Sequence, residues 1–364
     1  MSGRERFLAI ARGELKGELF LPFNLNYAWF MDETLERWHG EGLPREADPL
    51  VAFGLDRVAF TGGKPYTPIP PFDVHVLAED DETRVVRDEL GVTKRVSKRH
   101  EHSTMPQWLD FPIKSRGDFR EFQTRLDPHS PSRRPAHWSR LKEDWASRDY
   151  PLGIGPGSFF GHTLQRWVGT ENLCMLLYDD PAFVHDMLDC LEWFFLELLQ
   201  GLVAEVEFDF ASFGEDIAYK GRSFVSPAMF REFFLPHYVR ICELLRGRGV
   251  GIIFVDSDGC IDELIPLWLE VGVNGFSPLE VAAGEDALAL KRRYGRDIVL
   301  AGNVDKRALA RGRADVDREV AKARRLLDLG GYVPAPDHSV PPDVPLESFR
   351  YFLRTLRSGG EPAI

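Results

Sequence analysis

Asp256 and Asp258 end a stretch from Gly251 to Gly259 that reads GIIFVDSDG. The apolar run from Ile252 to Val255 is typical of a strand buried on both faces, as in a parallel sheet. Side chains two residues apart on a strand point the same way, so both carboxylates are predicted to enter one space. Neighbouring carboxylates repel each other, and a shared proton, a metal ion or a cationic side chain would relieve the repulsion.

Other polar side chains also follow predicted strands. They are Asn24, Asn26, Ser158, His162, Glu215, Asp216, Glu280, Asn303, Asp305, Asp337 and His338. In a parallel β/α barrel the strand ends meet at one mouth, where the chemistry takes place, so several acids are expected to converge there. Any one of them is also typical of a helix N-cap or turn, Asp305 most of all. Lys220, Arg166 and Lys306 are the cationic side chains considered for balancing the acids.

Strands and helices alternate regularly after residue 150. The predicted strands are 152–157, 208–213, 252–255, 273–276, 298–301 and 331–333, and the helices between them open with caps such as Asp180-Pro181 and Ser226-Pro227. A strand at 19–23 and one more between 50 and 115 would complete a (β/α)₈ TIM barrel. An open doubly wound sheet is the alternative, although no GxGxxG motif follows a strand.

Residues 50–115 differ from the rest of the chain in their sequence pattern. Prolines are followed by alternating or β-branched segments at 74–77, 83–87 and 92–97, and Glu89-Leu90-Gly91 predicts a hairpin turn. This part is too short and polar to bury a core of its own. We therefore predict one barrel domain over residues 1–364, with 50–115 as an N-terminal β-hairpin excursion lying over it.

The composition is that of an ordinary globular protein, with 44% hydrophobic and 28% charged residues. A net charge of −12 disfavours nucleic acid and anionic membranes as partners. We find neither a signal peptide nor a membrane span. Four scattered cysteines without CxxC spacing indicate reduced thiols in a cytoplasmic protein.

At these residues the chain resembles the uroporphyrinogen decarboxylase superfamily, which also contains zinc-dependent corrinoid-to-thiol methyltransferases. The resemblance covers most of the chain. It rests on the segments 104–112 (TMPQWLDFP), 158–173, 214–238, 254–259 (FVDSDG), 302–312 (GNVDKRALARG) and 330–353. It implies a barrel enzyme, a loose expectation of a homodimer, and a functional histidine loop at His338.

The chain departs from both characterised branches of that superfamily. The decarboxylases carry an arginine-bearing loop after the first strand, where this chain reads NLNYAWFMDE, so a tetrapyrrole substrate is not expected. The methyltransferases bind zinc through a His-x-Cys pair and a later cysteine. Here the pair is Asp256-x-Asp258 and the later position falls at Ala335 or Pro336. Hard carboxylates therefore stand where soft thiolates are expected.

We predict a decarboxylase-like acid/base enzyme that acts on a small carboxylated molecule. Asp256 or Asp258 would donate a proton or stabilise positive charge, and His338 with Asp337 would transfer protons. The predicted substrate contacts are Asn24, Asn26, Tyr27, Arg166, Glu215, Asp216 and Lys220, and a hypothetical divalent metal site, such as zinc, comprises Asp256, Asp258, Glu215 and His338. The alternatives are a methyltransferase that uses cobalamin on a corrinoid protein, with an altered metal site, and a non-catalytic ligand-binding barrel.

Overall fold

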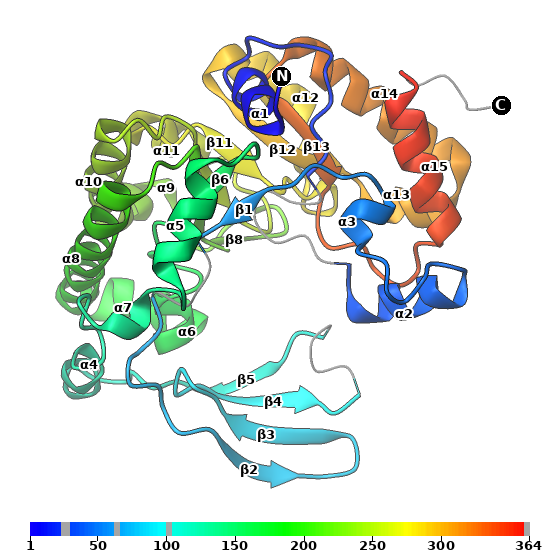
Figure 1. Cartoon of the computed structure of the whole chain (residues 1–364). Helices are drawn as coiled ribbons and strands as arrows, with labels where there is room; N and C mark the ends of the chain where they lie inside the picture. Colours follow the sequence, from blue (N-terminus) through cyan, green and yellow to red (C-terminus); the bar gives the residue numbers. More distant parts are fainter. Residues whose placement is uncertain (23–29, 62–65, 100–103, 360–364) are drawn as a thin grey trace.

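A curled sheet of seven parallel strands forms the centre of the computed structural model (Figure 1). The structure describes residues 1–22, 30–61, 66–99 and 104–359. The strands lie side by side in chain order: β1 (Ala59–Phe60), β6 (Leu152–Ile154), β7 (Phe210–Gly214), β10 (Ile253–Asp256), β11 (Gly275–Ser277), β12 (Val299–Val304) and β13 (Tyr332–Pro336). Because every pairing is parallel, all carboxyl ends meet at one edge of the sheet.

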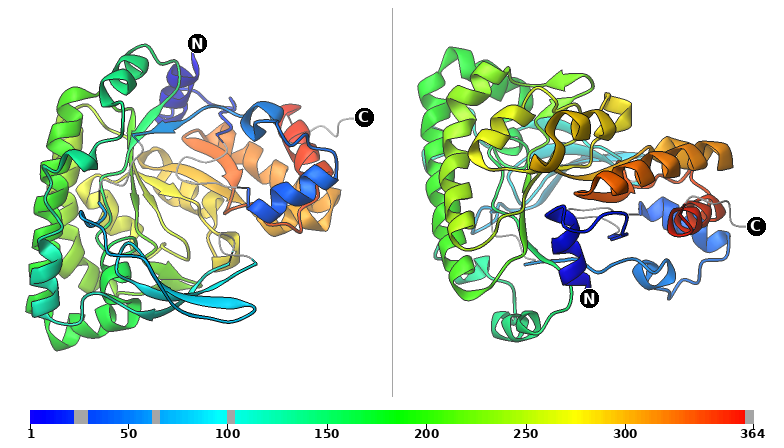
Figure 2. Two further views of the ribbon diagram at one scale, coloured as in Figure 1. Left: turned by 60° about the horizontal axis from the view of Figure 1, so that its bottom comes forward. Right: turned by 90° about the horizontal axis from the view of Figure 1, so that it is seen from above.

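Aromatic and aliphatic side chains fill the inside of the curled sheet. Phe210, Phe254 and Val333 pack there with Phe7 of helix α1 (Gly3–Ala11), which lies within the curl in the right-hand view of Figure 2. Gly275 makes room for this packing, since a Cβ at that position would lie 2.4 Å from the Phe254 ring. The interior is therefore a packed core, and the cavity that remains lies at the carboxyl edge.

Helices such as α8 (Pro181–Glu205), α10 (Leu235–Gly247) and α14 (Arg313–Leu329) lie outside the curled sheet, and the helices together bury the larger hydrophobic cluster (Figure 1). The other α-helices that follow α1 in the described residues are α2 (Asp32–Gly40), α3 (Pro49–Ala52), α4 (Arg116–Gln123), α5 (Trp138–Ala146), α6 (Leu164–Val168), α7 (Thr170–Asp179), α9 (Pro227–Met229), α11 (Ile265–Val271), α12 (Ala287–Tyr294), α13 (Lys306–Arg311) and α15 (Leu346–Arg357). The predicted caps are confirmed at α8, where Asp180 accepts a hydrogen bond from the amide of Phe183, and at α9, where Ser226 accepts one from Met229. Among the helices of the described ranges, none is long and apolar enough to cross a membrane.

The fold confirms the parallel α/β architecture but not the full closure into eight strands. The predicted strand at 19–23 contributes a single bridge between Pro22 and Asp56 in its described part. The amide of Leu21 donates to the Asp56 side chain (2.6 Å) instead of joining a strand ladder. Within the described residues the sheet is thus a curled one of seven strands, with β1 at one edge and β13 at the other.

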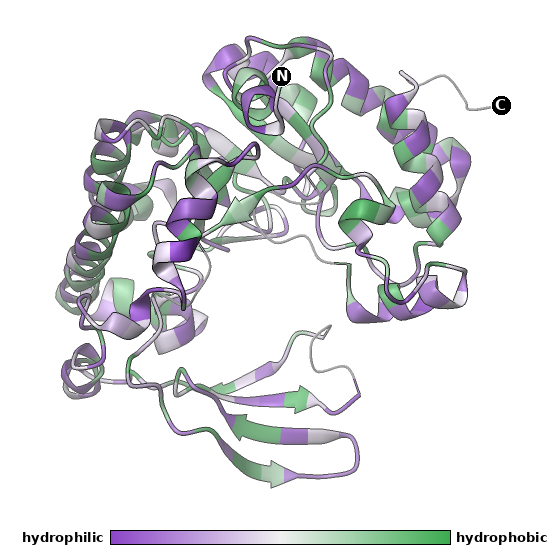
Figure 3. Ribbon diagram, in the orientation of Figure 1, coloured by the Kyte–Doolittle hydropathy of each residue, from purple (hydrophilic) through white to green (hydrophobic). Residues whose placement is uncertain are grey.

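The predicted hairpin is part of a four-stranded antiparallel sheet, which lies apart from the curled sheet in Figures 1 and 3. Its strands are β2 (His75–Glu79), β3 (Thr83–Arg87), β4 (Thr93–Ser97) and β5 (Gln107–Asp110). The turn forms as expected, because the amide of Asp88 donates to the carbonyl of Val92 (2.9 Å). The fourth strand, β5, returns the chain toward α6, where Trp108 contacts Arg166.

Candidate active site

A cavity of about 530 Å³ opens at the carboxyl edge of the curled sheet. Its walls come from β1, β7, β10 and the loops that follow the strands. They comprise Phe60, Tyr66, Gly155, Gly157, Ser158, His162, Thr163, Ser212, Gly214, Asp216, Asp256, Asp258, Pro278, His338 and Ser339. The volume suits a small-molecule ligand. Of the acids expected to converge at the strand ends, Asp216, Asp256 and Asp258 line this cavity.

Asp256 is the last residue of β10 and lines the cavity between two neighbouring strands. Its backbone pairs with Gly214 of β7 and Ser277 of β11, and its Oδ1 accepts a hydrogen bond from Ser277 Oγ at 3.3 Å. Burial, reinforced by the charges of Asp216 and Asp258, raises the pKa of Asp256 well above the usual aspartate range. This carboxyl group therefore holds its proton at a higher pH than an ordinary aspartate.

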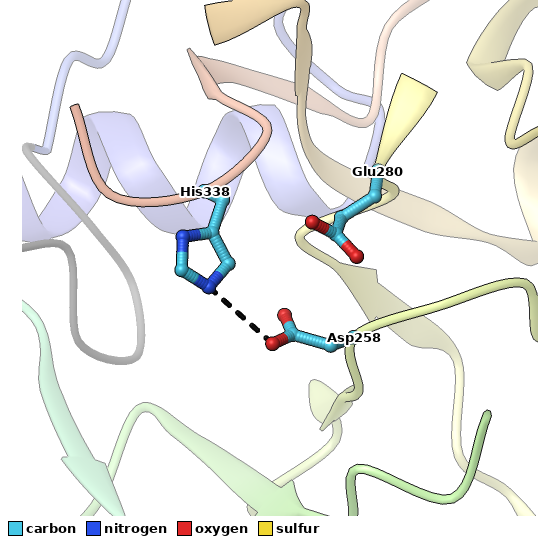
Figure 4. A group of neighbouring side chains, drawn as sticks. All are labelled: Asp258, Glu280 and His338. Carbon is cyan, nitrogen blue, oxygen red and sulfur yellow. Dashed lines mark ion pairs between the residues drawn. The ribbon is translucent and has the colours of Figure 1, made fainter. Parts of the chain in front are cut away.

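Asp258 and His338 form an ion pair across the cavity mouth, with 3.3 Å between Asp258 Oδ2 and His338 Nε2 (Figure 4). The hydrogen bond to Asp258 raises the pKa of His338 despite partial burial. Burial acts to raise the pKa of Asp258, but the hydrogen bond and charge of His338 outweigh it and the pKa is lowered. Asp256 and Asp258 thus have opposite pKa shifts although they are only two residues apart.

Gly259 explains why a glycine ends this motif. Its φ is +86°, and a Cβ there would lie 2.5 Å from the backbone carbon of Ala218 in strand β8 (Ala218–Tyr219), which pairs with β9 (Arg222–Ser223). The close approach fixes the loop that carries Asp258, and the amide of Gly259 donates to Glu280 Oε2 at 3.0 Å.

Asp216 and His162 form a second pair in the lining of the cavity, with 3.8 Å between Asp216 Oδ2 and His162 Nε2. Burial raises the pKa of Asp216 and lowers that of His162, so both shifts favour the uncharged forms. Asp216 has a φ of +40°, and its Oδ1 accepts a hydrogen bond from the amide of Asp258 (3.2 Å). Such backbone strain in a non-glycine residue is common at functional sites.

Among the residues that the structure describes, one group of side chains has the spacing to hold a metal ion. Ligand atoms of Asp258, Glu280 and His338 all lie within 4.8 Å of one another, and Figure 4 shows the three side chains around one space. Glu280 has other partners as well, since Lys306 Nζ lies 3.4 Å from its Oε1. This set differs from the predicted one, which included Asp256 and Glu215.

Glu215 and Asp337 have structural contacts instead of the predicted roles. Glu215 is fully buried and accepts hydrogen bonds from the amides of Phe159 (2.9 Å) and Phe160 (2.8 Å), so it holds the loop after β6. Asp337 is also buried and accepts hydrogen bonds from the amides of Lys306 and Val281, each at 2.9 Å. Buried backbone amides need hydrogen-bond acceptors, and here both carboxylates serve as those acceptors. Asp258, not Asp337, is the acid that pairs with His338.

The predicted substrate contacts are divided among several places. Arg166 lies outside the main cavity, in an adjoining recess that shares Asp216 and Asp258 with it. Lys220 is exposed in the turn between β8 and β9 and lines neither space. Asn24, Asn26 and Tyr27 fall outside the described residues.

Some described residues near the site were not expected from the sequence. Tyr66 lines the cavity and donates a hydrogen bond to the carbonyl of Gly155, although it lies far from any predicted strand end. Away from the cavity, His237 of α10 is buried and its Nδ1 lies 2.7 Å from Glu192 Oε2 of α8. His162 was among the polar residues after strands, but its pairing with Asp216 depends on a tertiary contact.

A solved methyltransferase from Methanosarcina mazei is similar in structure. The match covers 99% of this chain and 98% of that chain with a TM-score of 0.62 and 15% identity, which shows a shared fold. A B12-independent methionine synthase from Shewanella sp. W3-18-1 matches over 95% and 96% of the two chains at 12% identity, but its TM-score of 0.41 is too low to show a shared fold. No curated protein matches the sequence.

The family comparison agrees with the resemblance found in the sequence. The family model for uroporphyrinogen decarboxylase (URO-D) matches residues 163–359, more than half of the chain. The match includes β7, β10 and β13, which carry Asp216, Asp256 and His338 at or just beyond their ends. The chain therefore belongs to the uroporphyrinogen decarboxylase (URO-D) family.

Proposed function

We propose that this protein is an acid–base enzyme that removes a carboxyl group from a small molecule. The observation that carries the proposal is the opposite pKa shift of Asp256 and Asp258 within one cavity. Titratable groups whose environments separate their pKa values are typical of acid and base partners in catalysis. Membership of an enzyme family supports the assignment to an enzyme.

In the proposed reaction Asp256 acts as the general acid. It gives its proton to the substrate carbon that bears the carboxylate, the bond between that carbon and the carboxylate breaks, and CO₂ leaves. The electron pair of that bond becomes the new C–H bond, so the reaction consumes one proton. His338, held as an imidazolium by Asp258, returns a proton to Asp256 and is itself recharged from water.

The test uses a panel of small aromatic and heteroaromatic carboxylic acids, with release of CO₂ as the readout. The wild-type protein should decarboxylate at least one compound and, in D₂O, place deuterium on the vacated carbon. Asp256→Asn keeps the size of the side chain but removes the transferable proton, and should lower the rate by about 10²- to 10⁴-fold. Asp144→Asn, on the exposed face of α5, is the matched control and should leave the rate unchanged. Full activity in Asp256→Asn would refute the proposal.

The second candidate is methyl transfer assisted by a divalent metal, which the group of Asp258, Glu280 and His338 favours. Two carboxylates and an imidazole suit zinc or a harder divalent ion. The similar structure from Methanosarcina mazei is a methyltransferase, which agrees with this candidate at the level of the fold. When bound, a metal would supply Lewis-acid activation, while Lys306 would keep Glu280 oriented.

Binding measurements distinguish the two candidates. Methyl transfer predicts about one tightly bound divalent ion per chain and binding of methylcobalamin, or of a corrinoid protein that carries it. Decarboxylation through Asp256 predicts turnover that survives removal of metal by a chelator. Turnover that is lost on chelation and restored by zinc would favour the second candidate.

A further inference from the structure

A small recess adjoins the main cavity beside Asp216 and Asp258. Its volume is about 200 Å³, and its walls include Trp108 and Phe111 from the antiparallel-sheet segment, Phe224, and Arg166 of α6. A cavity of about 150 Å³ can hold a benzene molecule, so the recess has room for one planar ring with a small substituent. Three aromatic side chains give it apolar walls that suit such a ring.

Arg166 brings a cation to this recess, and its guanidinium has no hydrogen bond or ion pair with any residue in the described ranges. The acids whose charges reach it, Asp216 and Asp88, have other partners: Asp216 faces His162, and Asp88 pairs with Lys94 at 2.9 Å. By contrast, the buried Arg148 is paired with Asp209 at 2.9 Å. A partly buried guanidinium without a counter-ion is costly to keep charged, and burial indeed lowers the pKa of Arg166.

The guanidinium of Arg166 stacks on the ring of Trp108. The guanidinium carbon lies 4.5 Å from the centre of the Trp108 ring, close enough for a cation–π contact. A guanidinium stacked on a ring still has the donors along its edge free, and a carboxylate can accept two of them in parallel. The site is thus prepared for an anion, although the chain as a whole is acidic with a net charge of −12.

We propose that this recess binds an anionic, planar group of the substrate, such as a ring carboxylate, through Arg166 and Trp108. This inference rests on the proposed function for the reacting end, which would lie at Asp256 in the main cavity. The anchored anion is a second group, distinct from the carboxylate that is lost, and it stays in the product. The substrate class is therefore a small ring compound with at least two acidic groups.

The test measures binding by titration calorimetry with benzoate and its neutral analogue benzamide, which have nearly the same shape. Wild-type protein should bind benzoate at least about tenfold more tightly than benzamide, as expected for hydrogen bonds to a charged group. Arg166→Gln should abolish this preference, and Arg166→Lys should restore only part of it because lysine lacks the planar fork. Arg231→Gln is the matched control, since Arg231 is exposed and paired with Glu270 at 2.6 Å.

The outcomes separate this inference from the proposed reaction, because binding needs no turnover. Asp256→Asn should keep the preference for benzoate even if decarboxylation is not the reaction. Equal affinity of wild-type protein for the two compounds, binding of neither, or a preference that persists in Arg166→Gln with an unchanged melting temperature would each overturn the inference.

Discussion

Replacing Asp256 with asparagine should make the protein more stable at neutral pH while it loses activity. Asparagine has the same size and can still accept the hydrogen bond from Ser277 Oγ, which is 3.3 Å from Asp256 Oδ1. It removes a carboxyl group whose ionised form is disfavoured by burial and by the nearby Asp216 and Asp258. The wild-type protein therefore bears a cost of folding that the variant does not.

The magnitude follows from the direction of the pKa shift. An unfolded aspartate loses its proton at about pH 3.9, whereas folded Asp256 keeps it to a higher pH. Between these two values the folded state binds more protons than the unfolded state, so stability falls as pH rises, by up to about 1.4 kcal/mol per pH unit. For a chain of 364 residues the unfolding entropy is about 0.8 kcal/mol per kelvin, which makes this slope about 2 °C per pH unit.

The assay is a series of thermal unfolding scans between acidic and mildly alkaline pH. The difference in melting temperature between Asp256→Asn and wild type should grow with pH across the window and then level off above the raised pKa. Asp144→Asn controls for the loss of one exposed carboxylate, because its partner Arg140 lies only at 4.0 Å and the side chain is mostly exposed. A difference that is independent of pH would show that folding does not raise the pKa of Asp256, and a variant that is less stable at neutral pH would show that the carboxylate is paired with a cation. Either result would refute the reasoning.

Three further predictions concern other parts of the site. Because Asp258 raises the pKa of His338, the stability that this pair contributes should be present below the usual histidine range and lost as pH rises through the raised pKa. The melting temperatures of His338→Gln and wild type should therefore converge at high pH. A difference in melting temperature that stays constant with pH would contradict this. Gly302→Ala should destabilise by roughly 2 to 4 kcal/mol in denaturant unfolding, since φ is +108° and the new Cβ would lie 2.0 Å from the carbonyl oxygen of Pro278. Gly249→Ala, with a φ of +85° but open space, should cost less, and equal losses would show that the contact is unimportant. If a divalent metal occupies the Asp258, Glu280 and His338 group, dialysis against a chelator should lower the melting temperature, with recovery on adding zinc; no change would exclude a stabilising ion there.

Local patterns in the sequence were enough to predict most elements of the curled sheet. The predicted strand at 252–255 is β10 (Ile253–Asp256), and the cap at Asp180 opens α8 as expected. Asp305 also behaves as its position before a helix suggests, accepting a hydrogen bond from the amide of Arg307 at 2.9 Å. These features depend on neighbours within a few residues, so a single sequence carries them.

Long-range contacts decided the role of each acid. Glu215 and Asp216 are adjacent in the chain, but the first turns to the amides of Phe159 and Phe160 and the second faces the cavity. Asp337 and His338 divide in the same way, because adjacent side chains at a strand end point to opposite sides. Which side holds buried amides and which holds the cavity depends on how the loops pack.

By itself, the sequence determined that strands and helices alternate, that acids follow the strands, and that Asp256 and Asp258 face one space. Only the tertiary structure decided that Asp258 pairs with His338, that Glu280 lies in one group with these two residues, and that Arg166 stacks on Trp108. Arg166 and Trp108 come from separate elements, α6 and β5, so no local pattern links them. The physical reason is that strand and helix preferences act over a few residues, whereas charge pairing and burial depend on distances between parts of the chain that meet only after folding.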